Sequence, residues 1–231
     1  MKITAIIPAA GCGKRMRLKA DKPFIKICGK EIICYPLRVL ERVSAVSEVV
    51  VVAERKNIFK MKALVKREGF RKVKYIIEGG KRRCESVLNG LKAADEDSDF
   101  ILIHDCARPL VERSMIEKTI RVALKDNCAI AAVRVKPTIK QACSGRCFVE
   151  KTLDRAFLWE AQTPQVFKAC LLRAAYRKVG KSAGSFTDDS GIVENAGNRV
   201  RIVESSYRNI KITTCEDLVI ARALIKESNK S

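Results

Sequence analysis

Apolar runs that suit buried strands alternate with stretches of helical periodicity along most of this 231-residue chain. The strands that this pattern predicts begin at Ile3 and continue at 48–53, 73–77, 100–104, 129–135 and 200–203. Helices are expected at 31–43, within 55–74, from the turn at 79–80 to about 94, at 112–124, at 167–178, from 187–189 to 195, and at 216–226. Since parallel strands need crossover connections, the alternation predicts an α/β fold: a Rossmann-like, mostly parallel sheet with helices on both faces.

The alternation stops between residues 137 and 156. Two short extended runs, 138–142 and 147–152, flank Ser144-Gly145, which is a turn signal. They predict a β-hairpin arm that protrudes from the sheet. Residues 155–165 are interpreted as the segment that brings the chain back, and the length suits a single domain over 1–231 that includes the arm.

The net charge of +20 is the most unusual bulk property. It indicates anionic partners, such as nucleotides, phosphorylated metabolites or nucleic acid. The densest basic stretch, 55–74, also carries apolar residues at helical spacing, which is typical of a solvated helix face. Aromatic residues are sparse and are not interleaved with the cations, which argues against single-strand binding, so a basic nucleic-acid-binding protein is kept only as an alternative from another class.

Ten cysteines are scattered along the chain without a Cys-x-x-Cys pair, and His104 is the only histidine. No zinc site of familiar spacing results, and reduced thiols in a cytoplasmic protein are expected. No apolar run approaches the roughly 20 residues of a membrane span, and the first residues show no signal-peptide pattern.

A glycine loop, Pro8-Ala9-Ala10-Gly11-Cys12-Gly13-Lys14-Arg15, follows the first predicted strand. Its small residues let the backbone approach a ligand closely, and backbone N–H groups beside fixed cations suit a phosphate. The loop is not a Walker A motif, because Arg15 stands where Ser or Thr is needed. Met16 replaces the third glycine of a dinucleotide fingerprint.

Several polar residues share one expected position, just after predicted strands. In an open parallel sheet, ligands bind at the carboxyl ends of the strands. One pocket is therefore expected to gather Arg15, Lys22, Arg83, Ser86, Asp105, Arg108 and Thr138.

An ordered set of motifs runs nearly from end to end. It comprises the glycine loop, Lys22-Pro23, Gly79-Gly80-x-x-Arg83-x-x-Ser86-Val87, His104-Asp105-x-Ala107-Arg108-Pro109, Thr138-Ile139-Lys140, Arg155-x-x-x-Trp159, Gln162-Thr163-Pro164-Gln165, Thr187-Asp188-Asp189 and Asn209-Ile210-Lys211-Ile212-Thr213. With these motifs the chain resembles the 2-C-methyl-D-erythritol 4-phosphate cytidylyltransferases of the non-mevalonate isoprenoid pathway.

The resemblance implies a single nucleotidyltransferase domain that transfers CMP from CTP to 2-C-methyl-D-erythritol 4-phosphate and releases pyrophosphate. It implies Mg²⁺ held mainly by the CTP phosphates, with no protein metal ligand. It also implies a homodimer in which the arm reaches the partner's site. The implied catalytic residues are Arg15, Lys22, Arg155 and Lys211. Those implied for CTP are Pro8, Ala9, Ala10, Gly11, Gly13, Gly80, Arg83, Ser86, Asp105 and Ala107. Those implied for the acceptor are Asp105, Arg108, Thr138, Arg155, Thr163 and Lys211.

The chemistry suits these residue types. The attacking phosphate is already anionic, so no general base is needed, and fixed cations offset the repulsion between two anions. His104 is therefore interpreted as a support of the strand end, and Asp188 and Asp189 as helix-start charges.

The chain departs from the family pattern at Asp21, Lys81 and Pro137, which lie beside expected substrate contacts. A ribitol 5-phosphate cytidylyltransferase would share the loops and differ in the acceptor pocket. It is the nearest alternative.

Overall fold

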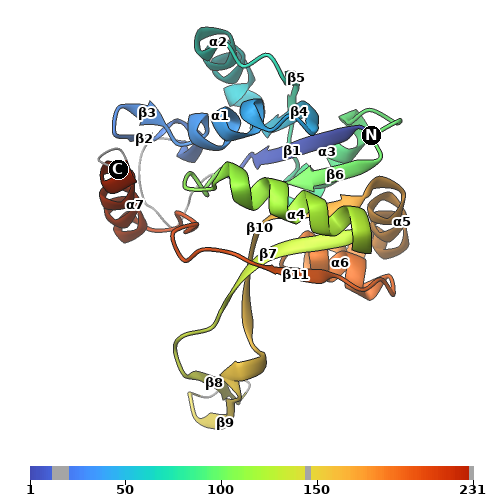
Figure 1. Ribbon diagram of the computed structural model, residues 1–231, viewed down its shortest axis with the longest axis vertical. Coiled ribbons are helices and arrows are strands. Elements are labelled where there is room, and N and C mark those ends of the chain that lie inside the picture. Colours follow the sequence, from blue (N-terminus) through green and yellow to red (C-terminus); the bar gives the residue numbers. More distant parts are fainter. Residues whose placement is uncertain (12–20, 144–146, 229–231) are drawn as a thin grey trace.

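The computed structural model describes residues 1–11, 21–143 and 147–228 of the chain (Figure 1). Seven strands form one sheet in the order β11-β7-β10-β6-β1-β4-β5. Every neighbouring pair is parallel except those of β10, which runs antiparallel to β6 and β7. The bounds are β1 Ile3–Ala9, β4 Val46–Ala53, β5 Val73–Glu78, β6 Phe100–Ile103, β7 Cys128–Arg134, β10 Trp159–Lys168 and β11 Arg201–Glu204. The expected mostly parallel α/β sheet is confirmed.

Helices cover both faces of the sheet, because the central strands are apolar on both sides. In β1, Ile3, Ala5 and Ile7 pack into one core, and Ile6 packs into the other. The first core includes α1 (Cys34–Arg42), α2 (Ile58–Glu68) and α4 (Arg113–Asp126). The second includes α3 (Arg83–Ala93), α5 (Ala169–Val179) and α6 (Asp189–Asn195).

A third, smaller core lies at the side of the molecule (Figure 1). It joins the hairpin of β2 (Lys26–Ile27) and β3 (Lys30–Glu31) to α7 (Cys215–Ser228). None of the described helices is long and apolar enough to cross a bilayer.

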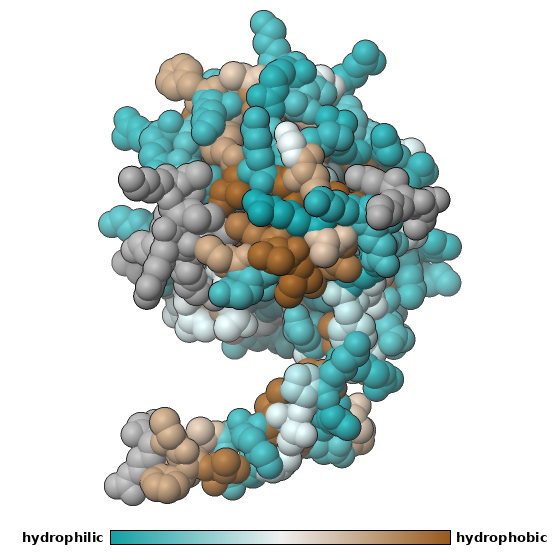
Figure 2. Space-filling model, turned by 90° about the vertical axis from the view of Figure 1, so that its left-hand side faces the viewer, coloured by the Kyte–Doolittle hydropathy of each residue, from teal (hydrophilic) through white to brown (hydrophobic). Residues whose placement is uncertain are grey.

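The arm consists of β8 (Ile139–Ala142) and β9 (Val149–Leu153), which pair antiparallel outside the main sheet. It extends far from the body of the molecule (Figure 1), and Figure 2 shows it standing clear of a largely hydrophilic surface. Phe148 and Phe157, near its tip and its base, are 72% and 82% exposed. The protruding hairpin was expected from the sequence.

Strand β10 corrects one expectation. A helix was expected from Phe167, but Phe167 lies in β10 opposite Ile101 and Cys128, and α5 begins only at Ala169. The residues that begin β10, Trp159-Glu160-Ala161-Gln162-Thr163, contain no continuous apolar run. The strand is therefore specified by its insertion between β6 and β7 rather than by local patterning.

Close packing of α3 on the sheet leads to a stability prediction. A Cβ atom at Gly90 would lie 2.6 Å from Ile6 Cγ2, so Gly90→Ala overpacks the core and should lower the free energy of unfolding by about 1–3 kcal/mol. Thermal and urea unfolding measure this change.

Gly191→Ala is the matched control, because its Cβ would make ordinary contacts of 3.4 Å with Asp188 Oδ1 and Phe186 Cδ1. It should leave the free energy of unfolding within about 0.5 kcal/mol of the original or raise it slightly. Equal stabilities for the two variants would contradict the packing of α3 on β1.

Candidate functional site: two joined cavities

A first cavity of about 310 Å³ opens where β1 and β6 end and α3 begins. Its lining comes from the ends of β1 and β6, the turn between β5 and α3, the start of α3, Lys22 and the segment before α7. The lining residues are Pro8, Ala10, Gly11, Lys22, Gly80, Lys81, Arg82, Arg83, Ser86, Asp105, Cys106, Ala107, Lys211 and Thr213. Asp105 is the one carboxylate among these described residues. The cavity is therefore suited to an anionic ligand.

A second cavity of about 430 Å³ adjoins the first. It lies against β10, β7 and the start of α6, with Arg108, Thr163 and Gln165 in its wall. Arg83, Asp105 and Lys211 line both cavities, so these three charged side chains stand at the junction.

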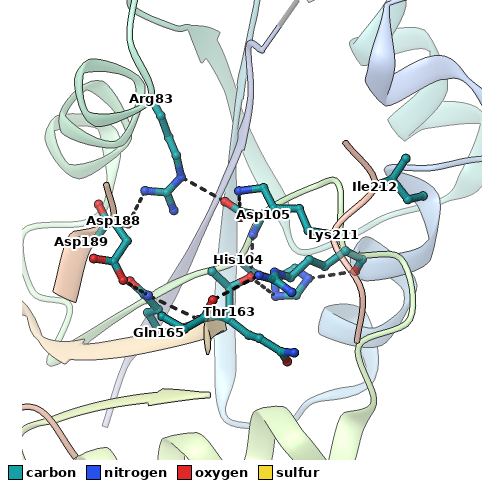
Figure 3. Close-up of polar contacts among 12 residues, drawn as sticks. Arg83, His104, Asp105, Thr163, Gln165, Asp188, Asp189, Lys211 and Ile212 are labelled. Carbon is teal, nitrogen blue, oxygen red and sulfur yellow. Dashed lines mark hydrogen bonds and ion pairs between the residues drawn. The ribbon is translucent and has the colours of Figure 1, made fainter. Parts of the chain in front are cut away.

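The junction is a row of alternating charges (Figure 3). Arg83 Nε donates to Asp105 Oδ1 at 3.0 Å, and Lys211 Nζ lies 2.6 Å from Asp105 Oδ2. On its other side, Arg83 Nη1 donates to Asp189 Oδ2 at 2.7 Å. Burial alone would raise the pKa of the Asp105 carboxyl, but Arg83 and Lys211 outweigh it and hold that pKa well below its usual range. Asp105 is thus a permanent anion that holds two cations.

His104 supports the segment that carries Asp105 and Arg108 through hydrogen bonds of both ring nitrogens. Its Nε2 lies 3.1 Å from the Arg108 carbonyl oxygen, which can only accept, so Nε2 carries the proton. Nδ1 then accepts from the Thr163 hydroxyl at 3.1 Å, and that hydroxyl oxygen accepts from the Asp105 backbone N–H. The ring is fully buried and both of its nitrogens are engaged in these hydrogen bonds, as expected for a residue that supports the strand end.

Two glycines allow close packing around the turn after β5. A Cβ atom at Gly79 would lie 2.4 Å from Ala10 Cβ in the loop after β1, and one at Gly80 would lie 2.3 Å from Glu85 Cβ in α3. The Gly80 N–H donates to Ser86 Oγ at 3.1 Å, and the Lys81 N–H donates to the Glu85 carboxylate at 2.9 Å. The turn that borders the first cavity is therefore held in place before any ligand binds.

Most of the residues expected at the site lie in these cavities. Those in the first are Pro8, Ala10, Gly11, Lys22, Gly80, Arg83, Ser86, Asp105, Ala107 and Lys211. Arg108 and Thr163 line the second, and Ala9 is buried at the end of β1. Lys22 Nζ donates to the Ile212 carbonyl at 2.8 Å, which ties it to the segment that carries Lys211. Gly13 and Arg15 lie outside the described residues.

Thr138 requires a correction to the expected single pocket. Thr138 and Arg155 both lie exposed at the base of the arm, and neither lines either of the two cavities. Arg155 Nη1 donates to the Lys136 carbonyl instead, at 2.5 Å. The reason is that the chain leaves the sheet after β7, so these residues follow the arm outward rather than the strand end inward.

Comparison with known proteins decides the family. The model of the IspD family, 2-C-methyl-D-erythritol 4-phosphate cytidylyltransferase, matches residues 3–227. The chain belongs to this family.

Its relatives match over nearly their whole length. The cytidylyltransferase of Geotalea uraniireducens (strain Rf4) is 39% identical over 99% of both chains. That of Alkaliphilus oremlandii (strain OhILAs) is 41% identical over 97% of this chain and 95% of its own. The crystal structure of 4-diphosphocytidyl-2C-methyl-D-erythritol synthase from Anaerococcus prevotii superimposes with a TM-score of 0.85 at 32% identity, covering 97% and 96% of the two chains.

The sequence interpretation of this cytidylyltransferase missed part of the site. Asp188 caps the start of α6, in agreement with the expected helix-start charge, since its side chain accepts from the Gly191 N–H at 3.0 Å. Asp189 is buried and pairs with Arg83 and with the hydroxyl of Tyr176. The one signal was a second acid directly after a helix cap, and nothing in the sequence connected it to Arg83.

One group of three candidate metal ligands occurs among the described residues: Glu31, Cys34 and Glu68. Arg67 pairs with both glutamates, and Arg38 pairs with Glu68. None of these ligands lines either cavity of the cytidylyltransferase.

The buried His104 predicts acid sensitivity. Burial lowers the pKa of its imidazole from 6.5 to about 4. Below pH 6.5 the imidazole therefore binds a proton in the unfolded chain but not in the folded chain. The free energy of unfolding should therefore fall by about 3 kcal/mol between pH 6.5 and pH 4. Urea unfolding across this pH range measures the change.

His104→Gln is the control, since a glutamine keeps a donor for the Arg108 carbonyl but does not titrate. Its free energy of unfolding should be nearly flat down to about pH 5, where carboxylates begin to contribute. An equally steep fall in the variant would assign the effect to other groups.

Proposed function

We propose that this cytidylyltransferase binds CTP in the first cavity and 2-C-methyl-D-erythritol 4-phosphate in the second. The observation that carries the proposal is that the two cavities share one charged wall, Arg83, Asp105 and Lys211. A phosphate oxygen of the acceptor then attacks the α-phosphorus of CTP at this wall. A new P–O bond forms, the bond to the bridging oxygen breaks, and pyrophosphate leaves with that electron pair.

The chain's contribution to this step is electrostatic. Two unit charges 4 Å apart repel by ~1 kcal/mol in water and by ~4 kcal/mol at an effective dielectric constant of 20. Lys22, Lys211 and Arg83 bring fixed cations to the cavity walls, and Asp105 keeps two of them from moving apart. Because the nucleophile is already an anion, no side chain has to remove a proton, which agrees with a histidine that is buried and neutral.

Mg²⁺ is proposed to bind mainly through the CTP phosphates. What supports this is that Asp105, the carboxylate of the first cavity among the described residues, already has both oxygens paired with cations. The cavity therefore suits an ion that arrives with the nucleotide. When bound, it would neutralise part of the phosphate charge.

A homodimer is proposed in which the arm of one chain completes the partner's site. The support is geometric: Thr138 and Arg155 lie away from the cavities of their own chain, on an arm that stands clear of the body (Figure 1). Exposed Phe148 and Phe157 give the arm apolar area to bury against a second copy. A cytoplasmic location is proposed as well, supported by nine described cysteines that carry no disulfide.

A pyrophosphate-release assay tests the function. CTP, UTP, ATP and GTP are each offered with 2-C-methyl-D-erythritol 4-phosphate or ribitol 5-phosphate, with Mg²⁺ and with chelator. We expect release with CTP, the methylerythritol acceptor and Mg²⁺. Preference for ribitol 5-phosphate would overturn the acceptor assignment. Tight, salt-sensitive RNA binding without any pyrophosphate release would favour the nucleic-acid alternative.

Lys22→Ala should raise the activation barrier by ~2–4 kcal/mol, as for the loss of one transition-state donor, with a native circular dichroism spectrum. Lys118→Ala is the matched control, because Lys118 Nζ also donates to a backbone carbonyl, that of Glu204, but lies outside both cavities. Equal turnover of the two variants would remove Lys22 from the reaction.

The arm is tested by mixing two inactive variants. Arg155→Ala damages the arm contribution, and Lys22→Ala damages the cavity. In a mixed dimer with two-fold symmetry, one of the two sites has both residues intact, so an equal mixture should recover about a quarter of the original activity. Recovery should need time for subunit exchange. No recovery in exchanged mixtures would mean that the arm acts on its own chain.

A further inference from the structure

We propose that Asp189 and Tyr176 are positioning residues that hold the Arg83 guanidinium at the junction of the two cavities. The inference rests on the proposed function, because it assigns to Arg83 a phosphate of the bound substrates. Neither residue lines the first cavity, and their effect on the reaction passes through Arg83.

The contacts form a continuous line across three elements. Asp189 begins α6, and its Oδ2 accepts from Arg83 Nη1 at 2.7 Å. Its Oδ1 accepts from the Tyr176 hydroxyl of α5 at 2.6 Å. Arg83, the first residue of α3, reaches on to Asp105 after β6. Figure 3 shows the guanidinium lying between the two aspartates.

Burying the Asp189 carboxylate costs free energy. Asp189 is fully buried and Tyr176 is 3% exposed. A buried ion pair is often no more stable than a packed apolar pair, so stability alone does not account for a carboxylate here. Arg83 differs from its partner: its side chain is 27% exposed and lines both cavities.

The hydrogen bonds also orient the guanidinium. Asp105 takes the Nε edge and Asp189 takes Nη1, while Nη2 makes no hydrogen bond to another described residue. A guanidinium held at two points cannot rotate, so its remaining donors keep one direction. Planar, fixed donors are what bidentate recognition of a phosphate requires.

Two effects of removing the Asp189 charge oppose each other. Coulomb attraction alone predicts that Arg83, with one countercharge fewer, binds an anionic phosphate more tightly. Loss of orientation predicts weaker binding and slower reaction, because the guanidinium is free to turn. The direction of the change therefore separates a positioning residue from a mere countercharge.

The experiment uses the full-length protein and the isosteric variants Asp189→Asn and Tyr176→Phe, each alone and combined with Arg83→Gln. Asp189→Asn should lower kcat about tenfold to a hundredfold, and Tyr176→Phe about threefold to tenfold, from the loss of hydrogen bonds to charged groups. In the Arg83→Gln background both effects should vanish, since residues that act through one group are not additive.

Asp126→Asn is the matched control. It removes one charge of the exposed ion pair in which Arg201 Nε lies 3.0 Å from the Asp126 carboxylate, outside both cavities. It should leave kcat and both KM values unchanged. Additive losses in the double variants, an unchanged kcat with only a lowered Tm, or tighter CTP binding in Asp189→Asn would each overturn the proposal.

Binding of inorganic pyrophosphate, measured by titration calorimetry, separates this inference from the proposed function. Asp189→Asn should weaken pyrophosphate binding about tenfold, but not in the Arg83→Gln background. If the unchanged protein releases no pyrophosphate from CTP, the proposed function fails and this titration still decides the role of Asp189. Should Asp189→Asn fail to fold, Tyr176→Phe gives the same decision, and equal pyrophosphate affinities overturn the proposal.

Discussion

The Asp105 carboxylate is the constraint on which the site depends. It lies at the end of β6, is buried, and accepts from Arg83 on one oxygen and Lys211 on the other. Without it, two cations from distant parts of the chain would repel each other inside a partly desolvated cavity. With it, they stay together and remain able to meet an anion. The Asp105 charge thus stabilises the cluster of cations at the junction of the two cavities.

The antiparallel strand β10 explains how the second cavity arises. By entering between β6 and β7 it places Thr163 beneath the Asp105 backbone and Gln165 in the cavity wall. Arg108 then ties β10 to the segment before α7, donating to the carbonyls of Asn209 and Ala161. Lys211 lies on that segment. The position of the Lys211 cation is therefore set by the sheet rather than by its own loop.

The two cavities and the arm are held in place in different ways. The turn at Gly79-Gly80 and the charge row at the junction are held by hydrogen bonds and ion pairs within one chain. The arm, in contrast, pairs β8 with β9 outside the main sheet, and the Arg155 side chain at its base donates to the Lys136 carbonyl. A ligand in either cavity would therefore meet charged groups that contacts within one chain already hold in place.

The sequence by itself determined the local features: apolar runs that become β1, β4 and β6, two glycine turns that allow close backbone approach, the capped start of α6, and the arm. Most of the site residues could be named in the same way, through ordered motifs. Only the tertiary structure decided that β10 is a strand, that Thr138 lies outside the two cavities, and that Asp189 meets Arg83, 106 residues away. The physical reason is the separation along the chain over which each effect acts. Periodicity and turn chemistry act over a few neighbouring residues, whereas strand order and buried ion pairs exist only once distant segments have packed together.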